Sequence, residues 1–446
     1  MFEIKLTNSL SKKKEIFVPL RKNELKIYVC GITPYDYSHL GHGRSYVNFD
    51  VLVRLFKFLG YDVNYVRNFT DIDDKILNKA QQLGNIGSYK ELANEFIEAY
   101  HQDLAALGCL SPNSEPRVTE YVPQIIIFIK ELLKNKNAYV IDSDVYYDIS
   151  TFNNYGKLSG RSLYDQQAGA RIEVDFRKKN PEDFVLWKGN NDEMFWNSPW
   201  GYGRPGWHIE CSVMASELLG KTVDIHGGGA DLIFPHHENE IAQSEGLHGC
   251  VLANYWLHNA FITINKEKMS KSFGNFVTLK DIFKKFDPMI LRYFFLQHHY
   301  RTPIDFNCDE LNASQTAYKK LVAAFGDHQI KQTSTSVPQN EIALKMFESL
   351  CDDLNTPKLI GLIFENLSEI KANSELINFT KSILVNILGF SLKQILEEQI
   401  EITPQIQELI NQREQARRDK NWALSDKLRD QLKVLGYEIR DTKIKL

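Results

Sequence analysis

The chain has 446 residues, 43% of them hydrophobic, and a formal net charge of −4. This excludes wholesale disorder and is too long for one domain, so we expect about two to four domains, and contact with nucleic acid has to come from local basic patches. The six cysteines follow no disulfide-like spacing, no apolar segment follows Lys12–Lys14, and the apolar run Ile125–Ile129 cannot span a membrane, so we expect a cytoplasmic protein without a membrane segment.

The first predicted unit is a strand, a helix and a second strand. Leu25–Val29 is apolar and partly β-branched, as a buried strand would be. Apolar residues from Tyr46 to Leu59 recur at helical spacing, and Gly60 suits the end of that helix. Val63–Val66 predicts the second strand, so the unit has the order typical of a parallel α/β sheet.

Two histidines and a glycine, His39, Gly41 and His42, lie at the turn into this helix. Free backbone N–H groups and the positive end of the helix dipole can hold a phosphate at such a turn. Imidazole N–H groups beside them can stabilise negative charge that develops on the phosphate. Histidines at a helix start also serve as surface or capping residues, so this turn alone leaves both interpretations open.

A second polar cluster follows the second strand. Thr70, Asp71, Asp73 and Asp74 come where the strand ends and a helix begins, which is the edge where α/β sheets bind ligands. Stabilisation of the helix N-terminus explains Asp73 and Asp74. Thr70 and Asp71 are therefore the candidates to face a ligand.

The middle of the chain changes character. Leu92–Leu107 and Val122–Leu133 have the pattern of amphipathic helices. From Tyr139 to Lys188 the pattern changes to short strands and turns. We interpret this region as an insertion that interrupts the sheet domain.

The sheet pattern then resumes. Gly203–Ser212 leads into a helix that runs through Leu219, and Val223–Ile225 predicts a strand. The strand is expected to open into a glycine-rich turn at His226–Asp231, where the backbone can approach a ligand closely. Pro235 suits the first position of the next helix.

Four side chains from three separate segments form a plausible zinc-binding set: Cys30, Cys211, His236 and Glu240. Thiolates, imidazole and carboxylate are ligand types that zinc accepts. All three segments lie at predicted strand-to-helix turns, and His236 and Glu240 share a helix face. The two cysteines are far apart in the sequence, and a lone buried cysteine usually acts as a small apolar residue. Spacing alone therefore leaves the metal interpretation open.

A polar, basic loop follows the predicted strand Ile262–Ile264. It contains Lys268 and Lys271, whose charges would suit a triphosphate. A charged loop in solvent is the ordinary meaning of such a run.

Several separated motifs together resemble one family. His39-Leu40-Gly41-His42 resembles the HIGH motif of class I aminoacyl-tRNA synthetases, and Lys268-Met269-Ser270-Lys271-Ser272 is identical to their KMSKS motif. Resemblance to cysteinyl-tRNA synthetases covers nearly the whole chain and rests on four further segments: Tyr28–Thr33, Asn68–Lys75, Gly206–Cys211 and Phe234–Glu240.

The resemblance implies an α/β fold with a Rossmann-type catalytic domain. Its two halves would be residues 1–120 and 196–262, separated by a connective insertion at 121–195. A stem-contact region with the KMSKS loop would follow at 263–310, a helical bundle at 311–402 and a small anticodon-binding region at 403–446. Two features of the sequence agree with the bundle, the helical pattern of Leu311–Phe325 and the segment Asp352–Pro357, which resembles a family element.

The resemblance also implies an activity, that of a cysteine–tRNA ligase. Cysteine and ATP would give cysteinyl-adenylate and pyrophosphate, and the cysteinyl group would pass to the 3′ end of tRNA(Cys). His39, His42, Lys268 and Lys271 would be catalytic, and Gly41 would join His39, His42 and Lys271 in binding ATP with Mg²⁺. One zinc ion per chain, held by Cys30, Cys211, His236 and Glu240, would bind the substrate thiolate. Thr70, Trp207 and Asp231 would contact the substrate cysteine, and a monomer is expected.

The residues from Gln405 onward are locally basic, with ten Lys and Arg against seven Asp and Glu. A basic end on an acidic protein suits a phosphate backbone. Arg413, Arg417, Arg418 and Trp422 are candidates to contact or stack on unpaired RNA bases. An amphipathic helix with a solvated face explains each of these side chains equally well.

Two other functions compete with tRNA charging. A ligase that joins activated cysteine to an amino-sugar would share the catalytic half, but Asp352–Pro357 and the basic C-terminal region favour tRNA. A non-catalytic RNA-binding relative should have lost a motif histidine or lysine, and this chain keeps His39, His42, Lys268 and Lys271.

Overall fold

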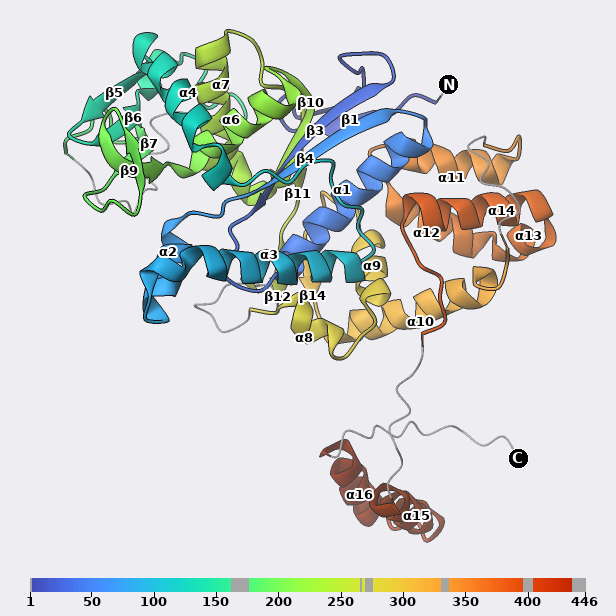
Figure 1. Ribbon diagram of the computed structural model, residues 1–446. Coiled ribbons are helices and arrows are strands. Elements are labelled where there is room, and N and C mark those ends of the chain that lie inside the picture. Colours follow the sequence, from blue (N-terminus) through green and yellow to red (C-terminus); the bar gives the residue numbers. More distant parts are fainter. Residues whose placement is uncertain are drawn as a thin grey trace. The chain divides into compact units, whose positions relative to one another are not determined.

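The chain forms two compact units, Met1–Lys393 and Gln394–Leu446 (Figure 1). The structure is a computed structural model that describes residues 2–161, 176–264, 267–268, 276–329, 337–395 and 404–434.

A four-stranded parallel sheet forms the centre of the larger unit and confirms the predicted α/β fold. Its order is β11-β10-β3-β4, with strands β3 (Glu24–Ile32), β4 (Asp62–Phe69), β10 (Val223–Gly229) and β11 (Ala253–Asn259). After β3 the chain adds β4 on one side of the sheet, and after β10 it adds β11 on the other side. The sheet therefore has its topological switch point between β3 and β10, where ligands bind outside the carboxyl ends of the strands.

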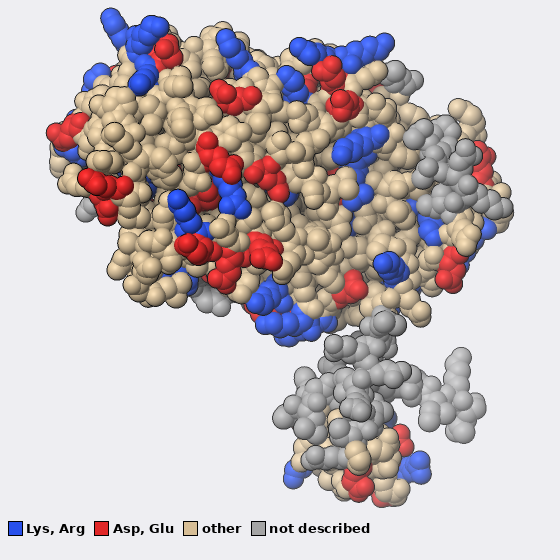
Figure 2. All heavy atoms as spheres, viewed as in Figure 1, with Lys and Arg blue, Asp and Glu red and all other residues tan. Residues whose placement is uncertain are grey.

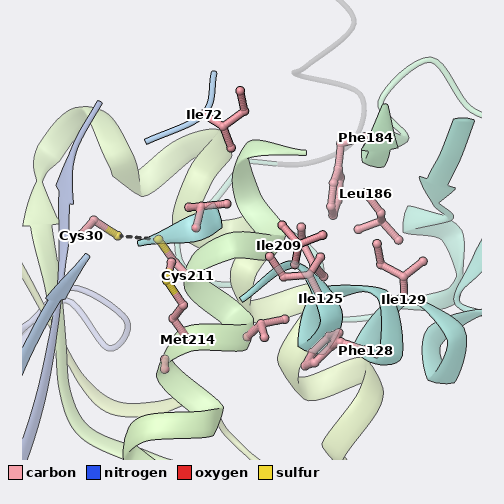
Figure 3. Close-up of a cluster of buried hydrophobic side chains, with 14 of the residues drawn as sticks. Cys30, Ile72, Ile125, Phe128, Ile129, Phe184, Leu186, Ile209, Cys211 and Met214 are labelled. Carbon is pink, nitrogen blue, oxygen red and sulfur yellow. Dashed lines mark hydrogen bonds between the residues drawn. The ribbon is translucent and has the colours of Figure 1, made fainter. Parts of the chain in front are cut away.

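Helices cover both faces of this sheet: α1 (Leu40–Phe58) lies on one side, and α6 (Trp207–Leu219) and α7 (Glu238–His248) lie on the other (Figure 1). Side chains alternate between the two faces of a strand. Tyr28 and Cys30 of β3 therefore join the same buried cluster as Met214 of α6. Figure 3 shows Cys30 pointing from its strand toward Cys211 and Met214 on the helix.

The predicted glycine-rich turn at His226 was wrong, because β10 continues through Gly229. His226 pairs in the sheet with Tyr28 on one side and Trp256 on the other, and its ring stacks on Trp256 at 4.5 Å. Gly227 is needed for packing, since an added Cβ would lie 2.4 Å from the Phe49 ring of α1. The glycines therefore let helix and strand approach each other closely.

The start of α1 agrees with the predicted turn at His39–His42, since the helix begins at Leu40, before the apolar pattern that starts at Tyr46. The start of the helix after β10 differs from its prediction. Pro235 lies in an irregular helical stretch, Ile233–His237, and α7 begins only at Glu238. Hydrophobic periodicity alone therefore does not mark where a helix begins.

The predicted insertion of short strands is present. An antiparallel sheet of order β5-β6-β7-β9-β8 contains β5 (Ala138–Ile141), β6 (Asp144–Tyr147), β7 (Phe184–Gly189), β8 (Trp196–Ser198) and β9 (Gly201–Pro205). Between β4 and this sheet the chain forms α2 (Asp74–Gln82), α3 (Tyr89–Ala106) and α4 (Val122–Lys134). This sheet ends at Pro205, beyond the boundary expected at residue 195, and the predicted domain boundaries stay predictions.

The remaining elements are small sheets and helices. A three-stranded sheet of order β13-β12-β14 contains β12 (Ile262–Ile264), β13 (Glu267–Lys268) and β14 (Ile304–Phe306), and its flanking helices are α8 (Leu279–Phe283) and α9 (Pro288–Leu296). The helical region comprises α10 (Cys308–Phe325), α11 (Glu341–Cys351), α12 (Thr356–Glu365), α13 (Leu367–Ala372) and α14 (Ser374–Ser382). The predicted helix Leu311–Phe325 is confirmed as part of α10. The smaller unit contains α15 (Pro404–Arg418) and α16 (Trp422–Val434).

An N-terminal hairpin of β1 (Lys5–Asn8) and β2 (Lys13–Ile16) links the parallel sheet to the helical region. The backbone N–H and hydroxyl of Thr7 donate to the Asp353 carboxylate at 2.8 and 2.6 Å. Tyr300 donates its hydroxyl to the same carboxylate at 2.7 Å. The backbone N–H of Ser9 donates to a carbonyl of β11. The segment Asp352–Pro357 therefore holds the chain's first strand in place.

The face of the larger unit drawn in Figure 2 carries basic and acidic side chains interspersed among uncharged ones. This face therefore shows no extended area of one charge, in keeping with the small net charge of the chain. Within the described residues, every helix is too short or too polar to cross a membrane.

Candidate active site

The predicted phosphate-binding turn forms the N-terminus of α1. Nδ1 of His39 accepts hydrogen bonds from the backbone N–H groups of Gly41 and His42 at 3.1 and 3.4 Å, and Nδ1 of His42 accepts from the backbone N–H of His39 at 3.4 Å. The two rings stack with their centroids 3.6 Å apart. An added Cβ on Gly41 would lie 2.9 Å from the His39 ring, so only glycine fits there. The structure thus brings His39, Gly41 and His42 together.

This arrangement sets the hydrogen-bonding role of His42. Burial lowers its pKa well below the ordinary value, and the neighbouring His39 lowers it further, so the ring is neutral at pH 7. Because Nδ1 of His42 accepts a hydrogen bond from a backbone N–H group, we assign the ring proton to Nε2. A neutral ring with an Nε2–H donor at a helix N-terminus is suited to hold a phosphate oxygen.

The segment after the predicted KMSKS loop is bound to the same turn. The backbone N–H of Leu40 donates to the carbonyl of Val277 at 3.3 Å, and that of Leu279 donates to the carbonyl of Ser38 at 2.8 Å. The Phe276 ring packs edge-on against His39 at 5.4 Å. On the near side of the loop, the backbone of Lys268 lies in β13. The side chain of Lys268 and all of Lys271 lie outside the described residues.

The four predicted metal ligands converge beside the switch point. The Sγ atoms of Cys30 and Cys211 lie 3.8 Å apart, and the two side chains point toward each other in Figure 3. Oε1 of Glu240 lies 3.5 Å from Sγ of Cys30 and 3.0 Å from Nε2 of His236. All four side chains are buried, and one ligand atom from each lies within 4.8 Å of the others. The structure therefore brings together residues that come from β3, α6 and the region around the start of α7.

The charges of this cluster suit a cation. Burial raises the pKa of Cys211, but hydrogen bonds from Cys30 and His236 outweigh burial and lower that pKa to about 6. Burial also raises the pKa of Glu240, but the charges of His226 and His236 outweigh it and hold the pKa well below its usual range. The cluster thus holds a thiolate and a carboxylate in a buried position, where an ion with two positive charges would be well compensated.

A second group of possible ligands overlaps the first, and the sequence analysis did not assign it. Cys30 and Glu240 are common to both groups, and His226 and His237 complete the second. Nε2 of His226 lies 2.7 Å from the second carboxylate oxygen of Glu240, and Nε2 of His237 lies 3.3 Å from Sγ of Cys30. Nδ1 of His237 in turn lies 2.8 Å from Nε2 of His258. The adjacent histidines His236 and His237 were the only sequence signal for this group.

The predicted substrate contacts lie at different depths. The hydroxyl of Thr70 is buried and donates to the Glu210 carboxylate at 2.7 Å. The ring of Trp207 stacks on His236 at 4.3 Å and remains 40% exposed. Asp231 is exposed in a 3₁₀ helix directly after β10. Trp207 and Asp231 are therefore accessible from solvent, and Trp207 contacts the cluster through His236, whereas Thr70 acts on Glu210.

Two polar residues near the thiols were missed as individual candidates, although both lie in motifs that the sequence analysis singled out. Oδ1 of Asn68 accepts from the backbone N–H of Gly31 at 2.9 Å and lies 3.7 Å from Sγ of Cys211. Glu210 is buried, and burial followed by the charge of Cys211 raises its pKa well above the usual range. Asn68 thus fixes the backbone beside Cys30, and the buried Glu210 carboxyl accepts a hydrogen bond from Thr70.

The predicted tRNA-binding residues lie in the smaller unit. Arg413 is buried, whereas Trp422 is 60% exposed and Arg418 is exposed with Glu414 at 3.8 Å. Arg417 is partly buried. The structure therefore leaves Arg418 and Trp422 as the more accessible candidates.

Comparison with known proteins finds relatives along nearly the whole length of the chain. Residues 16–316 match the family model of the tRNA synthetases class I (C) catalytic domain, and residues 400–445 match that of the cysteinyl-tRNA ligase anticodon binding domain. The cysteine–tRNA ligase of Geobacillus thermodenitrificans (strain NG80-2) is 46% identical, covering 99% of this chain and 98% of its own. That of Pelobacter propionicus (strain DSM 2379 / NBRC 103807 / OttBd1) is 42% identical, covering 98% of each chain.

Solved structures agree on the fold. Methionyl-tRNA synthetase of Mycobacterium tuberculosis in complex with methionyl-adenylate matches with a TM-score of 0.59 and 12% identity, over 83% of this chain and 92% of its own. The full-length relatives and the two matching family models show that the chain belongs to the cysteine–tRNA ligase family of class I aminoacyl-tRNA synthetases.

Proposed function

We propose that this chain activates L-cysteine with ATP to cysteinyl-adenylate and transfers the cysteinyl group to the 3′ end of tRNA(Cys). The observation that carries the proposal is the buried cluster of Cys30, Cys211, His236 and Glu240 at the carboxyl edge of the sheet that also presents the His39–His42 turn. A site that combines phosphate-binding groups with thiol-seeking groups suits a reaction between a nucleotide and a small thiol.

Activation requires in-line attack of a cysteine carboxylate oxygen on the α-phosphorus of ATP. The bond to the bridging oxygen breaks, and pyrophosphate leaves with the negative charge. Because no enzyme group has to form a bond, positioning and charge stabilisation dominate the catalysis. Nε2–H groups of His39 and His42, together with the N-terminus of α1, are placed to stabilise this charge. Lys268 and Lys271 supply positive charge, and ATP carries Mg²⁺.

The four-residue cluster fits a zinc ion in both ligand type and number. When bound there, zinc would take the substrate sulfur as a thiolate and so distinguish it from a hydroxyl. The remaining groups hold the ligands in place: His226 hydrogen-bonds to Glu240, and His208 lies with Nδ1 3.0 Å from Nδ1 of His236. Trp207 covers His236, Asp231 contributes a polar contact for the substrate, and Thr70 acts through its hydrogen bond to Glu210.

Cysteine-dependent exchange between ATP and pyrophosphate tests the proposed activity. The protein is assayed with each amino acid in turn, first without tRNA and then with it. We expect exchange with cysteine alone and, on addition of tRNA(Cys), cysteinyl-tRNA. Exchange without tRNA charging, but with transfer of cysteine to an amino-sugar, would support the competing ligase. Absence of exchange with every amino acid would support a non-catalytic RNA-binding relative.

Removal of the smaller unit should separate the two steps. A protein that ends at Lys393 keeps the sheet, the His39–His42 turn and the buried cluster. We expect its cysteine-dependent exchange to be unchanged, while kcat/KM for tRNA charging falls by at least roughly tenfold, because basic contacts to the phosphate backbone are lost. Both assays are run on the same preparation, with thermal unfolding as the control for folding. Loss of both activities in a folded protein would show that the two units do not act separately.

A further inference from the structure

Arg44 of α1 is a buried cation that has no anionic partner among the residues that the structure describes. It lies about one helical turn after His39 and is 1% exposed. Burial alone lowers its pKa, to about 10, with no carboxylate contributing to the shift. The guanidinium donates to five backbone carbonyl oxygens: Nη1 to Ala260 at 2.9 Å and Phe261 at 2.8 Å, and Nη2 to His299 at 3.2 Å, Tyr300 at 3.4 Å and Thr302. The four N–H groups of Nη1 and Nη2 thus serve five carbonyls, so at least one N–H is shared, and Nε has no hydrogen-bond partner within the described residues.

All five carbonyls lie in the two segments that lead into strands β12 and β14 of the small sheet β13-β12-β14. Ala260 and Phe261 lead into β12, and the stretch 299–302 leads into β14. The two segments also bond to each other, because the N–H of Ala260 donates to Tyr300 and that of Ile304 donates to Phe261. Farther along β12, Thr263 pairs with Lys268 of β13. Arg44 therefore fixes the strand that presents the backbone of the first KMSKS residue.

The start of α1 is also bound to the chain that follows the KMSKS motif. Leu40 and Ser38 exchange backbone hydrogen bonds with Val277 and Leu279. The described flanks on both sides of the motif are thus attached to the helix start that carries His39 and His42. The histidines of the helix start and Arg44 lie in one short segment, His39 to Arg44. The carbonyls that Arg44 binds lie more than 200 positions farther along the chain.

On the basis of the function proposed above, we propose that Arg44 is a positioning residue for adenylate formation, which fixes the β12–β13 strands and the Lys268 backbone in register with His39 and His42. The His39–His42 turn and the segment that begins at Lys268 both have to reach the same triphosphate. Misplacement of one end by about 1 Å can lower the rate by as much as about 10²-fold. An ammonium group has three donors and no planar fork, so lysine cannot satisfy five carbonyls at once.

Arg292 of α9 offers a matched control. It is also fully buried and donates to two backbone carbonyls, those of Leu388 at 2.6 Å and Leu107 at 2.8 Å, while pairing with Asp50. Its partners connect α1, the end of α3 and the helical region, and none of them belongs to β12, β13 or β14. Arg292→Lys should therefore lower the melting temperature without changing the rate of activation below that temperature.

The test compares Arg44→Lys, Arg44→Gln and Arg292→Lys in the full-length holoenzyme. The glutamine variant removes a charge whose burial is costly and keeps two N–H donors, so it is a second route to a folded protein. For folded Arg44 variants we expect kcat of cysteine-dependent exchange to fall by roughly 10- to 100-fold, with KM for cysteine and zinc content unchanged. Arg292→Lys should keep the wild-type kcat.

Each other outcome overturns a stated part of the argument. Arg44 variants that unfold at lower temperature but keep the wild-type kcat would assign Arg44 to stability alone, as would failure of both variants to fold. A similar loss of kcat in Arg292→Lys would show a general effect of core arginines. Wild-type protein without cysteine-dependent exchange would instead overturn the proposed function itself.

Discussion

Removal of the proposed zinc ion should lower the enzyme's preference for cysteine over serine by roughly 10⁴-fold, the size of discrimination seen where a site bonds directly to one substrate group. Cysteine and serine have nearly the same shape, so pocket size discriminates poorly between them. The thiol of free cysteine ionises near pH ~8.5, whereas a serine hydroxyl is far harder to ionise and is a poor zinc ligand. Serine would thus lack the bond that the substrate sulfur of cysteine would form with zinc.

Metal analysis and exchange kinetics check this result together. We expect about one zinc per chain, and competing serine activation should rise, relative to cysteine, after chelation. Two variants distinguish the overlapping ligand groups: Cys211→Ser removes a ligand of the first, and His237→Asn removes a ligand of the second. Zinc should be lost from the first variant and kept by the second. The account fails if metal-free enzyme still prefers cysteine, or if Cys211→Ser retains its zinc and its selectivity.

Replacement of His42 by asparagine should slow adenylate formation by roughly 10²- to 10³-fold, the range for loss of one electrostatic donor. The reason is the fixed orientation of the ring: Nδ1 accepts from the His39 backbone, and low pKa keeps the ring neutral with Nε2–H as donor. Lys271→Ala should cause a loss of the same order, because the KMSKS motif implies a charge on the same phosphates.

Single-turnover formation of cysteinyl-adenylate measures this effect without interference from product release. His328→Asn is the matched control, since this histidine follows α10 in the helical region and contacts Asn378 at 2.8 Å. The control should activate cysteine at the wild-type rate. An unchanged rate in His42→Asn, with thermal stability also unchanged, would remove His42 from the mechanism.

The sequence predicted the order of the central elements, but it misplaced the ends of several. Hydrophobic periodicity marks the buried length of a helix and says little about its first turn. The apolar pattern of α1 starts only at Tyr46, whereas the turn at His39–His42 indicated the true start, which His39 caps although histidine is not among the usual capping residues. Similarly, His226 was placed in a turn because polar and glycine residues are unusual in a buried strand, yet its neighbours β3 and β11 hold it there.

The candidate metal cluster shows a second limit of prediction from the sequence, which concerns residues that become neighbours only in the folded chain. Residue types alone made a zinc set from Cys30, Cys211, His236 and Glu240 plausible, and the family motifs made it specific. No local pattern indicates that β3 and β10 are neighbours, and that adjacency brings Cys30 within 3.3 Å of Nε2 of His237. Partners such as His226 and Asn68 depend on tertiary contact, which is why they appeared only in the structure.

The N-terminal hairpin has a consequence for how the chain is made. Thr7 contacts Asp353, which is 346 positions later, and at about 5–20 residues per second that partner is synthesised roughly 20 to 70 s after Thr7. Likewise, Ile27 of β3 pairs with Ile225 of β10. The nascent chain therefore carries β3 with an unpaired, apolar edge until β10 emerges, a condition that favours aggregation. Ribosome-associated chaperones that cover such edges would protect the catalytic unit during this interval, and the contact between Thr7 and Asp353 forms only after Asp353 has been synthesised.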